Sequence, residues 1–150
     1  MKKIITLSAL LALSLYAKDI EIKDAFIKQT PPNAVNSAIF LTIVNNTDKD
    51  ISLIDAKTDI NQVSELHTHE HKHGMKAMIQ IPEIPVKAHS STELKPGSYH
   101  IMLFKLNQAI DKNTKANLTL TFDNNQSLEV RDIGSVGGKI KFPFGKIKLP

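Results

Sequence analysis

The chain of 150 residues contains no cysteine. It can therefore form no disulfide, and its fold must depend on the burial of apolar side chains alone. Any metal site in this sequence must use nitrogen, oxygen or thioether ligands. Thiolate chemistry is excluded, and with it blue-copper electron transfer, which requires a cysteine ligand.

A strong excess of charge of one sign is also missing. The sequence has 19 Lys and Arg residues against 15 Asp and Glu residues. Lys2 and Lys3 belong to an N-terminal segment that we expect to be removed, which leaves 17 basic residues and a net charge near +2. This balance is too mild to indicate a nucleic acid or an anionic membrane surface as a partner.

The longest apolar run, from Ile4 to Leu15, is too short for a membrane-spanning helix, which needs ~20 residues. It follows a short basic start, which is the layout of a secretory signal peptide, and we expect residues 1–17 to be cleaved after Ala17. No cysteine follows the run, so a lipid anchor is not expected. The sequence predicts a periplasmic protein with no stable membrane insertion after cleavage; an uncleaved membrane anchor is the alternative.

No segment of useful length shows a helical period. Instead, nine short runs rich in strand-forming residues are separated by turn signals, at residues 20–27, 38–44, 51–54, 63–71, 76–81, 92–94, 99–106, 118–122 and 128–130. This pattern predicts an all-β, antiparallel β-sandwich or barrel of eight or nine strands. We expect one domain at residues 18–133, followed by a basic tail rich in Gly, Pro and Lys at residues 134–150.

Histidine and methionine are concentrated in two places. The stretch ELHTHEHKHGMKAM, residues 65–78, carries four histidines at every second position and then two methionines, namely His67, His69, His71, His73, Met75 and Met78. The second place is the sequence YHIM at residues 99–102. Beyond the signal segment, only His89 lies elsewhere. Random placement would scatter these residues, so the clustering indicates a site.

The strand expected at residues 99–106 presents alternate side chains to opposite faces. His100 and Met102 therefore share one face with Phe104, which could shield a bound ion. Taken alone, a His-x-Met pair is weak evidence, because methionine is a common core residue.

The stretch 65–78 is expected to form a hairpin that turns near Lys72-His73-Gly74. A loop with an even number of residues makes the paired positions sum to 145, which places His67 directly opposite Met78 with β-carbons ~5 Å apart. A loop with an odd number would place the two side chains on opposite faces. If the hairpin lies beside the strand of His100 and Met102, the four side chains converge.

Two neutral imidazoles and two neutral thioethers favour one kind of ion. Thioether sulfur is a soft ligand that selects Cu(I) over Mg, Ca, Mn or Zn. None of the four ligands has to lose a proton, so binding should persist until protons compete for imidazole. Four protein ligands also leave no open position for a substrate, which favours a carrier over an enzyme.

The same residues resemble the signature of the periplasmic copper chaperones called PCu(A)C. Ten residues separate His67 from Met78, and 21 separate Met78 from the His100-x-Met102 pair. The similarity runs from about residue 24 to residue 130, through NSAIFLTIVN, VSELH and ELKPGSYHIML. It implies a cupredoxin-like β-sandwich that holds Cu(I) at an exposed site through these four residues. It also implies delivery of copper to a terminal respiratory oxidase, at a CuA-type or other copper centre, or to another copper-handling assembly protein.

The sequence departs from this family at His69, His71 and His73, where relatives often carry methionines. Imidazole also binds Cu(II), Zn(II) and Ni(II), so one interpretation is an auxiliary metal site, with Met75 as a further candidate ligand. The other interpretation is a solvated hairpin tip that tolerates histidine. The alternative function is accordingly a His-rich metal buffer for divalent ions. An enzyme is not predicted, because no nucleophile–base constellation is present.

Overall fold

The computed structural model describes residues 18–138, 141–142 and 145–146, with side chains in the first of these ranges. The described residues form strands and no helix. The strands are β1 (Ile20–Lys28), β2 (Asn36–Asn45), β3 (Ile51–Thr58), β4 (Asn61–Lys72), β5 (Met75–Gln80), β6 (Ile84–Val86), β7 (Ser90–Leu94), β8 (His100–Leu106), β9 (Lys115–Phe122), β10 (Ser127–Val136), β11 (Lys141–Phe142) and β12 (Gly145–Lys146). Accordingly, nothing in the described part of the chain is a helix that could cross a membrane.

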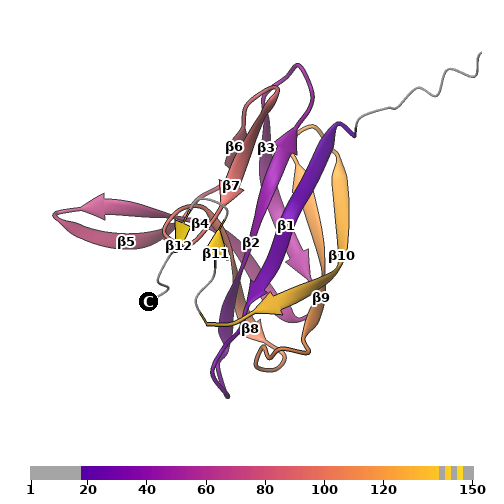
Figure 1. Ribbon diagram of the computed structural model, residues 1–150. Coiled ribbons are helices and arrows are strands. Elements are labelled where there is room, and N and C mark those ends of the chain that lie inside the picture. The colour runs from indigo at the N-terminus through magenta and orange to yellow at the C-terminus, as the bar shows by residue number, and fades with distance from the viewer. Residues whose placement is uncertain (1–17, 139–140, 143–144, 147–150) are drawn as a thin grey trace, which may run out of the picture.

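The main sheet has ten strands in the order β5-β4-β8-β2-β1-β10-β9-β3-β6, with β7 also paired to β2. It closes over itself as a sandwich, and the β4–β5 hairpin projects to one side (Figure 1). The predicted all-β sandwich is confirmed. The expected eight or nine strands did not include β6, whose Pro85 pairs with Ser52 at the end of the sheet order. Proline cannot donate to a ladder and is confined to such edges, so this short strand lacks the usual sequence pattern.

All strand pairs were expected to be antiparallel, and one pair is not. Strands β1 and β10 run parallel, with Ile27 paired to Ser135 and Lys28 to Val136. This pair joins the two layers of the sandwich. Strand β10 continues to Val136, three residues into the segment expected to be the tail. The expected signal segment, residues 1–17, lies outside the described residues.

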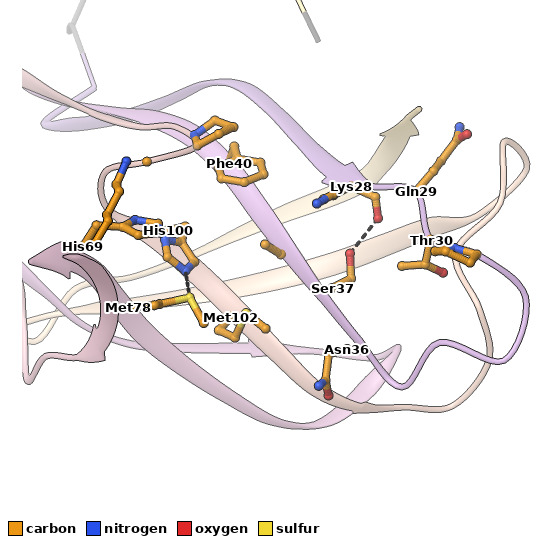
Figure 2. Close-up of a pocket in the computed structure, with 15 residues that line it drawn as sticks. Lys28, Gln29, Thr30, Asn36, Ser37, Phe40, His69, Met78, His100 and Met102 are labelled. Atoms are coloured by element: carbon orange, nitrogen blue, oxygen red, sulfur yellow. Dashed lines mark hydrogen bonds between the residues drawn. The ribbon is translucent and has the colours of Figure 1, made fainter. Parts of the chain in front are cut away.

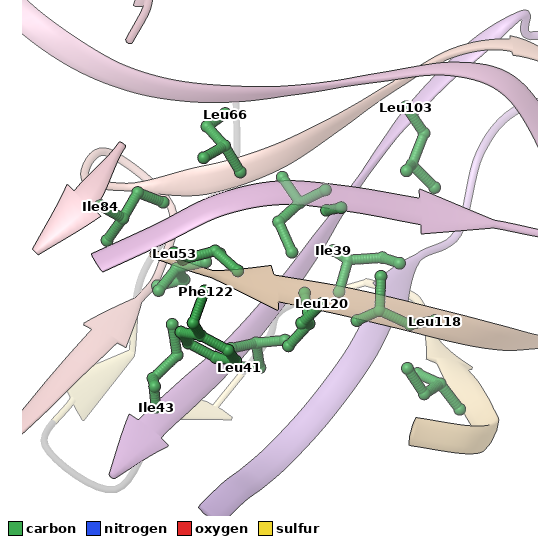
Figure 3. Close-up of a cluster of buried hydrophobic side chains, with 14 of the residues drawn as sticks. Ile39, Leu41, Ile43, Leu53, Leu66, Ile84, Leu103, Leu118, Leu120 and Phe122 are labelled. Carbon is green, nitrogen blue, oxygen red and sulfur yellow. The ribbon is translucent and has the colours of Figure 1, made fainter. Parts of the chain in front are cut away.

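The core lies between the layers and follows from strict alternation in the sequence. In β9, Leu118, Leu120 and Phe122 are buried, and the residues between them point outward. They meet Ile39 and Leu41 from β2 on the facing layer (Figure 3). Burial of each large apolar side chain contributes roughly 1.5–3 kcal/mol, so this cluster fixes the sandwich as a rigid frame.

The β4–β5 hairpin turns through two residues, His73 and Gly74. Their φ angles are 51° and 75°. A two-residue hairpin turn with positive φ at both positions is type I′, which strongly favours glycine at its second position. The turn therefore centres on His73-Gly74, one residue later than our predicted register, which paired positions summing to 145. His67 pairs with Gln80, and it is His69 that lies opposite Met78.

Candidate metal centre

Strand β8 provides the base of the candidate site. Ile101 and Leu103 point into the core and are fully buried. Because strand side chains alternate, His100 and Met102 point together to the other face, as predicted. Figure 2 shows them side by side at the base of a pocket. The two core residues that alternate with the candidate ligands hold β8 in place, and so fix the directions in which His100 and Met102 point.

Strand β4 lies beside β8 and adds its own alternating residues to this face. His67 pairs directly with His100, and Glu65 pairs with Met102. The ring centroids of His67 and His100 are 5.7 Å apart. Phe104 packs against His67, with 5.9 Å between the ring centroids. It therefore covers one side of the His67 ring.

Strand β5 brings Met78 to the same face, although the predicted opposition to His67 is wrong. A shift of two positions keeps Met78 on the same side of the hairpin, diagonal to His67, because faces repeat every second residue. The sulfur of Met78 lies 3.0 Å from Nε2 of His100 (Figure 2). The structure therefore brings these two residues together directly.

The protonation of His100 follows from its hydrogen bonds. Its Nδ1 lies 3.0 Å from the backbone oxygen of Ser98, and this oxygen can only accept, so Nδ1 carries the proton. Nε2 of the neutral ring then presents its lone pair to the Met78 sulfur, which has no proton to donate. Burial lowers the pKa of His100, the neighbouring His69 and His67 add to the lowering, and the Ser98 carbonyl opposes it. The neutral ring is therefore the favoured form.

His67 is held differently. It is 6% exposed, and its Nε2 lies 2.7 Å from Oε2 of Glu65. The carboxylate accepts the Nε2 proton, while Nδ1 is buried without a hydrogen-bond partner. A histidine that gives one ring proton to a carboxylate and presents its other nitrogen to a metal is a common arrangement in metal sites. The pattern Glu65-x-His67 is visible in the sequence, but Glu65 was not among the predicted site residues.

The pocket at the site has a volume of 440 Å³. His69, Met78, His100 and Met102 line it, with Phe40 of β2 beside them (Figure 2). Phe40 and His100 have ring centroids 6.3 Å apart. Phe40 was also missed, although alternation along β2 places it on the face opposite the core residue Ile39. Phe40, Met78 and Met102 give this part of the pocket an apolar wall.

The auxiliary candidates are spread along the hairpin. His69 is half-buried in the pocket, whereas His71 is exposed farther along β4 and His73 occupies the turn. Met75 lies opposite Lys72 on the other face of the hairpin and is 72% exposed. Within residues 18–138, counting only His, Cys, Asp and Glu, no group of three or more side chains is arranged to hold a metal ion.

Solved structures similar to this chain include a copper-bound PCuAC domain from PmoF2. Its TM-score is 0.65 at 17% sequence identity, with 80% of this chain and 96% of that domain covered. Another is the solution structure of CuI-DR1885 from Deinococcus radiodurans, with a TM-score of 0.59, 23% identity, and coverage of 84% and 80%. The expected cupredoxin-like PCu(A)C fold is thereby confirmed.

A curated relative, the uncharacterized protein RP573 of Rickettsia prowazekii, is 27% identical over 92 residues. These residues are 60% of this chain and 50% of the relative, so the chain spans half the length of that protein. The family model described as "Putative lipoprotein LpqE-like" matches residues 20–132. This match covers the whole sandwich from β1 into β10, and the chain belongs to the LpqE-like family.

Proposed function

We propose that the protein is a Cu(I) carrier that uses His67, Met78, His100 and Met102 as its ligands. The observation that supports this most strongly is the 3.0 Å approach of Met78 sulfur to Nε2 of His100. Both atoms present lone pairs, and a soft monovalent cation between such groups would bind to both. The buried Nδ1 of His67, which has no hydrogen-bond partner, adds a second nitrogen that is free to coordinate.

The ligand chemistry favours Cu(I) over divalent ions. Thioethers bind soft ions, and the site contains no anionic ligand directed into the pocket to favour a harder one. A Cu(I) ion held by these neutral groups keeps a charge of +1, and the aromatic wall at Phe40 limits contact with water. The similarity in fold to copper-bound PCuAC domains supports the same assignment.

A carrier must also release its ion, and the position of Met78 suits that task. Met78 belongs to β5, in the hairpin that projects from the sandwich (Figure 1). It is 44% exposed, while His67 and His100 are buried. Ligands of an acceptor could therefore approach from the Met78 side and replace the thioether first. We propose a terminal oxidase copper centre, CuA-type or other, or a copper-handling assembly protein, as the acceptor.

We further propose that the protein works in the periplasm after removal of residues 1–17. The basic start and short apolar run support export, as does the description of the family as lipoproteins.

The test is an anaerobic Cu(I) competition titration of the mature protein beside His100→Ala and Met102→Ala. One tight equivalent in the parent and a marked loss of affinity in both variants are expected. Met75→Ala is the matched control, since this methionine lies on the other face, and it should bind like the parent. A parent that binds Zn(II) or Ni(II) tightly but Cu(I) weakly would refute the proposal and favour a metal buffer.

A further inference from the structure

His69 occupies a special place on the hairpin. It pairs directly with Met78, and residues paired in this way have β-carbons ~4.5–5.5 Å apart. It also lines the same pocket as Met78, His100 and Met102. His71, two residues farther along the same face of β4, is exposed and does not line this pocket.

The ring of His69 is close to the ligand pair and lacks a partner of its own. Its centroid lies 5.4 Å from that of His100, slightly closer than the ring of His67 at 5.7 Å. Its Nδ1 is buried without a hydrogen-bond partner. Leaving a buried polar atom unpaired costs roughly 1–3 kcal/mol, and coordination of a cation would remove that cost.

His67 and His69 therefore offer two different imidazoles to the same pair of residues. His67 is the inner one, since it is almost fully buried, is bonded to Glu65 and does not line the pocket. His69 is the outer one, since it is half-buried and lies on the hairpin side of the pocket (Figure 2).

We propose that His69, Met78 and His100 form an outer copper position, next to the inner position that contains His67 and Met102. This inference rests on the proposed function. The two positions share Met78 and His100, so the ion can exchange His67 for His69 and still keep two protein ligands. All of the exchanging ligands are neutral, so the step moves no proton. Copper would enter and leave through the outer position, toward the exposed end of the hairpin.

The experiment compares His69→Gln with His69→Met, two side chains of similar length. The Cu(I)-loaded protein is mixed rapidly with excess bicinchoninate, and the rate of copper removal is followed by absorbance. In His69→Gln the removal rate should fall at least about tenfold, because the amide is a poor ligand for Cu(I). In His69→Met the thioether should restore most of the rate. His71→Gln is the matched control and should behave like the parent.

The equilibrium stoichiometry, measured in parallel, separates this inference from the proposed function. One tight Cu(I) equivalent is expected in the parent and all three variants, because the inner position remains intact. Equal removal rates in His69→Gln, His69→Met and the parent would overturn the outer position and leave the carrier function standing. A parent without a tight equivalent would overturn the carrier function itself.

Discussion

Met78 and His100 touch across an intervening strand. The Met78 sulfur lies 3.0 Å from Nε2 of His100, yet β4 separates β5 from β8 in the sheet. The residues are 22 positions apart in sequence. A long, flexible thioether can span a neighbouring strand, whereas a shorter side chain at this position could not. The contact therefore depends on both the length of methionine and the register of the hairpin.

Replacing Met78 with leucine distinguishes a role of Met78 in copper binding from a role in the stability of the fold. Leucine has a similar volume and Met78 is 44% exposed, so the free energy of unfolding should change by less than about 1 kcal/mol. Cu(I) affinity should fall at least about tenfold, or ~1.4 kcal/mol of binding free energy, because leucine offers no sulfur. Chemical denaturation and anaerobic competition titration measure the two effects.

Met75→Leu is the control for this change. Met75 precedes Met78 in the same strand but faces the other side of the hairpin. It should leave both the stability and the Cu(I) affinity of the protein unchanged. Equal affinity losses in the two variants would mean that thioethers act through the hairpin as a whole rather than through a defined site.

Glu65 is expected to orient His67 for coordination. In Glu65→Gln the amide oxygen can still accept the Nε2 proton, but the negative charge is lost. Such partners of metal-bound histidines typically change metal affinity by about 10- to 100-fold, and we expect a decrease in Cu(I) affinity near the lower end. The ¹⁵N chemical shifts of His67 should also show a larger fraction of the other tautomer, which a purely structural role would not produce.

Glu70→Gln provides the comparison for this variant. Glu70 is exposed on the opposite face of the same strand and pairs with Ala77. It should affect neither the His67 tautomer nor copper binding. If Glu65→Gln gives the same ¹⁵N shifts and affinity as Glu70→Gln, the carboxylate has no orienting role.

Alternation along the strands was sufficient to predict the sandwich and to place His100 and Met102 on one face. The hairpin register was not predictable in the same way, because several turns fit the residues Lys72-His73-Gly74. The choice between these turns depends on which residues can adopt a positive φ. A type I′ turn favours glycine at its second position, which is Gly74 here. The parallel pairing of Ile27 with Ser135 joins residues far apart in sequence, for which local pattern gives no signal.

The positions of the candidate ligands relative to one another were predicted in part. Ligand chemistry was sufficient to single out the histidines and methionines as candidates. An even number of loop residues was sufficient to place Met78 on the same face as His67. Two contacts of His100 could not be predicted by those means. The Ser98 carbonyl that fixes the proton of His100 is a backbone atom without a sequence signature. The approach of His69 to His100 results from the corrected register.

The turn should control the register, and Gly74 tests this. Its φ of 75° is unfavourable for any residue with a β-carbon, by roughly 1–2 kcal/mol. Gly74→Ala should therefore weaken the hairpin even though its new methyl group meets no atom within 4 Å. Faster amide hydrogen exchange in β5 and weaker Cu(I) binding are the expected results.

The same substitution at Gly134 is the control, because a β-carbon there also meets no atom within 4 Å and the backbone has no positive φ. His73→Asn complements it, since Asn-Gly is a preferred type I′ pair. That variant should keep both the hairpin and copper binding. Loss of copper binding in His73→Asn would instead assign the His73 imidazole a direct role as a ligand.

The lowered pKa of His100 predicts how the stability of the copper-free protein depends on pH. The unfolded chain takes up a proton near the ordinary value of 6.5, whereas the folded protein does so only at a lower pH. Between these two values the unfolded state binds more protons, so stability must fall as the pH falls. The contribution of His100 is fully present above pH 6.5 and is lost as the pH passes down through the folded pKa.

Denaturation curves of the parent and of His100→Gln, recorded over about three pH units from roughly pH 8 to pH 5, measure this contribution. Glutamine does not titrate, so the difference in unfolding free energy between the two proteins should shrink as the pH falls. A constant difference across the range would mean that His100 keeps its ordinary pKa in the folded protein. The lowered pKa of His100 also keeps its Nε2 unprotonated in mild acid. The burial that makes the protein less stable in acid should therefore preserve its Cu(I) affinity there. Loss of Cu(I) binding already near pH 6.5 would contradict this link.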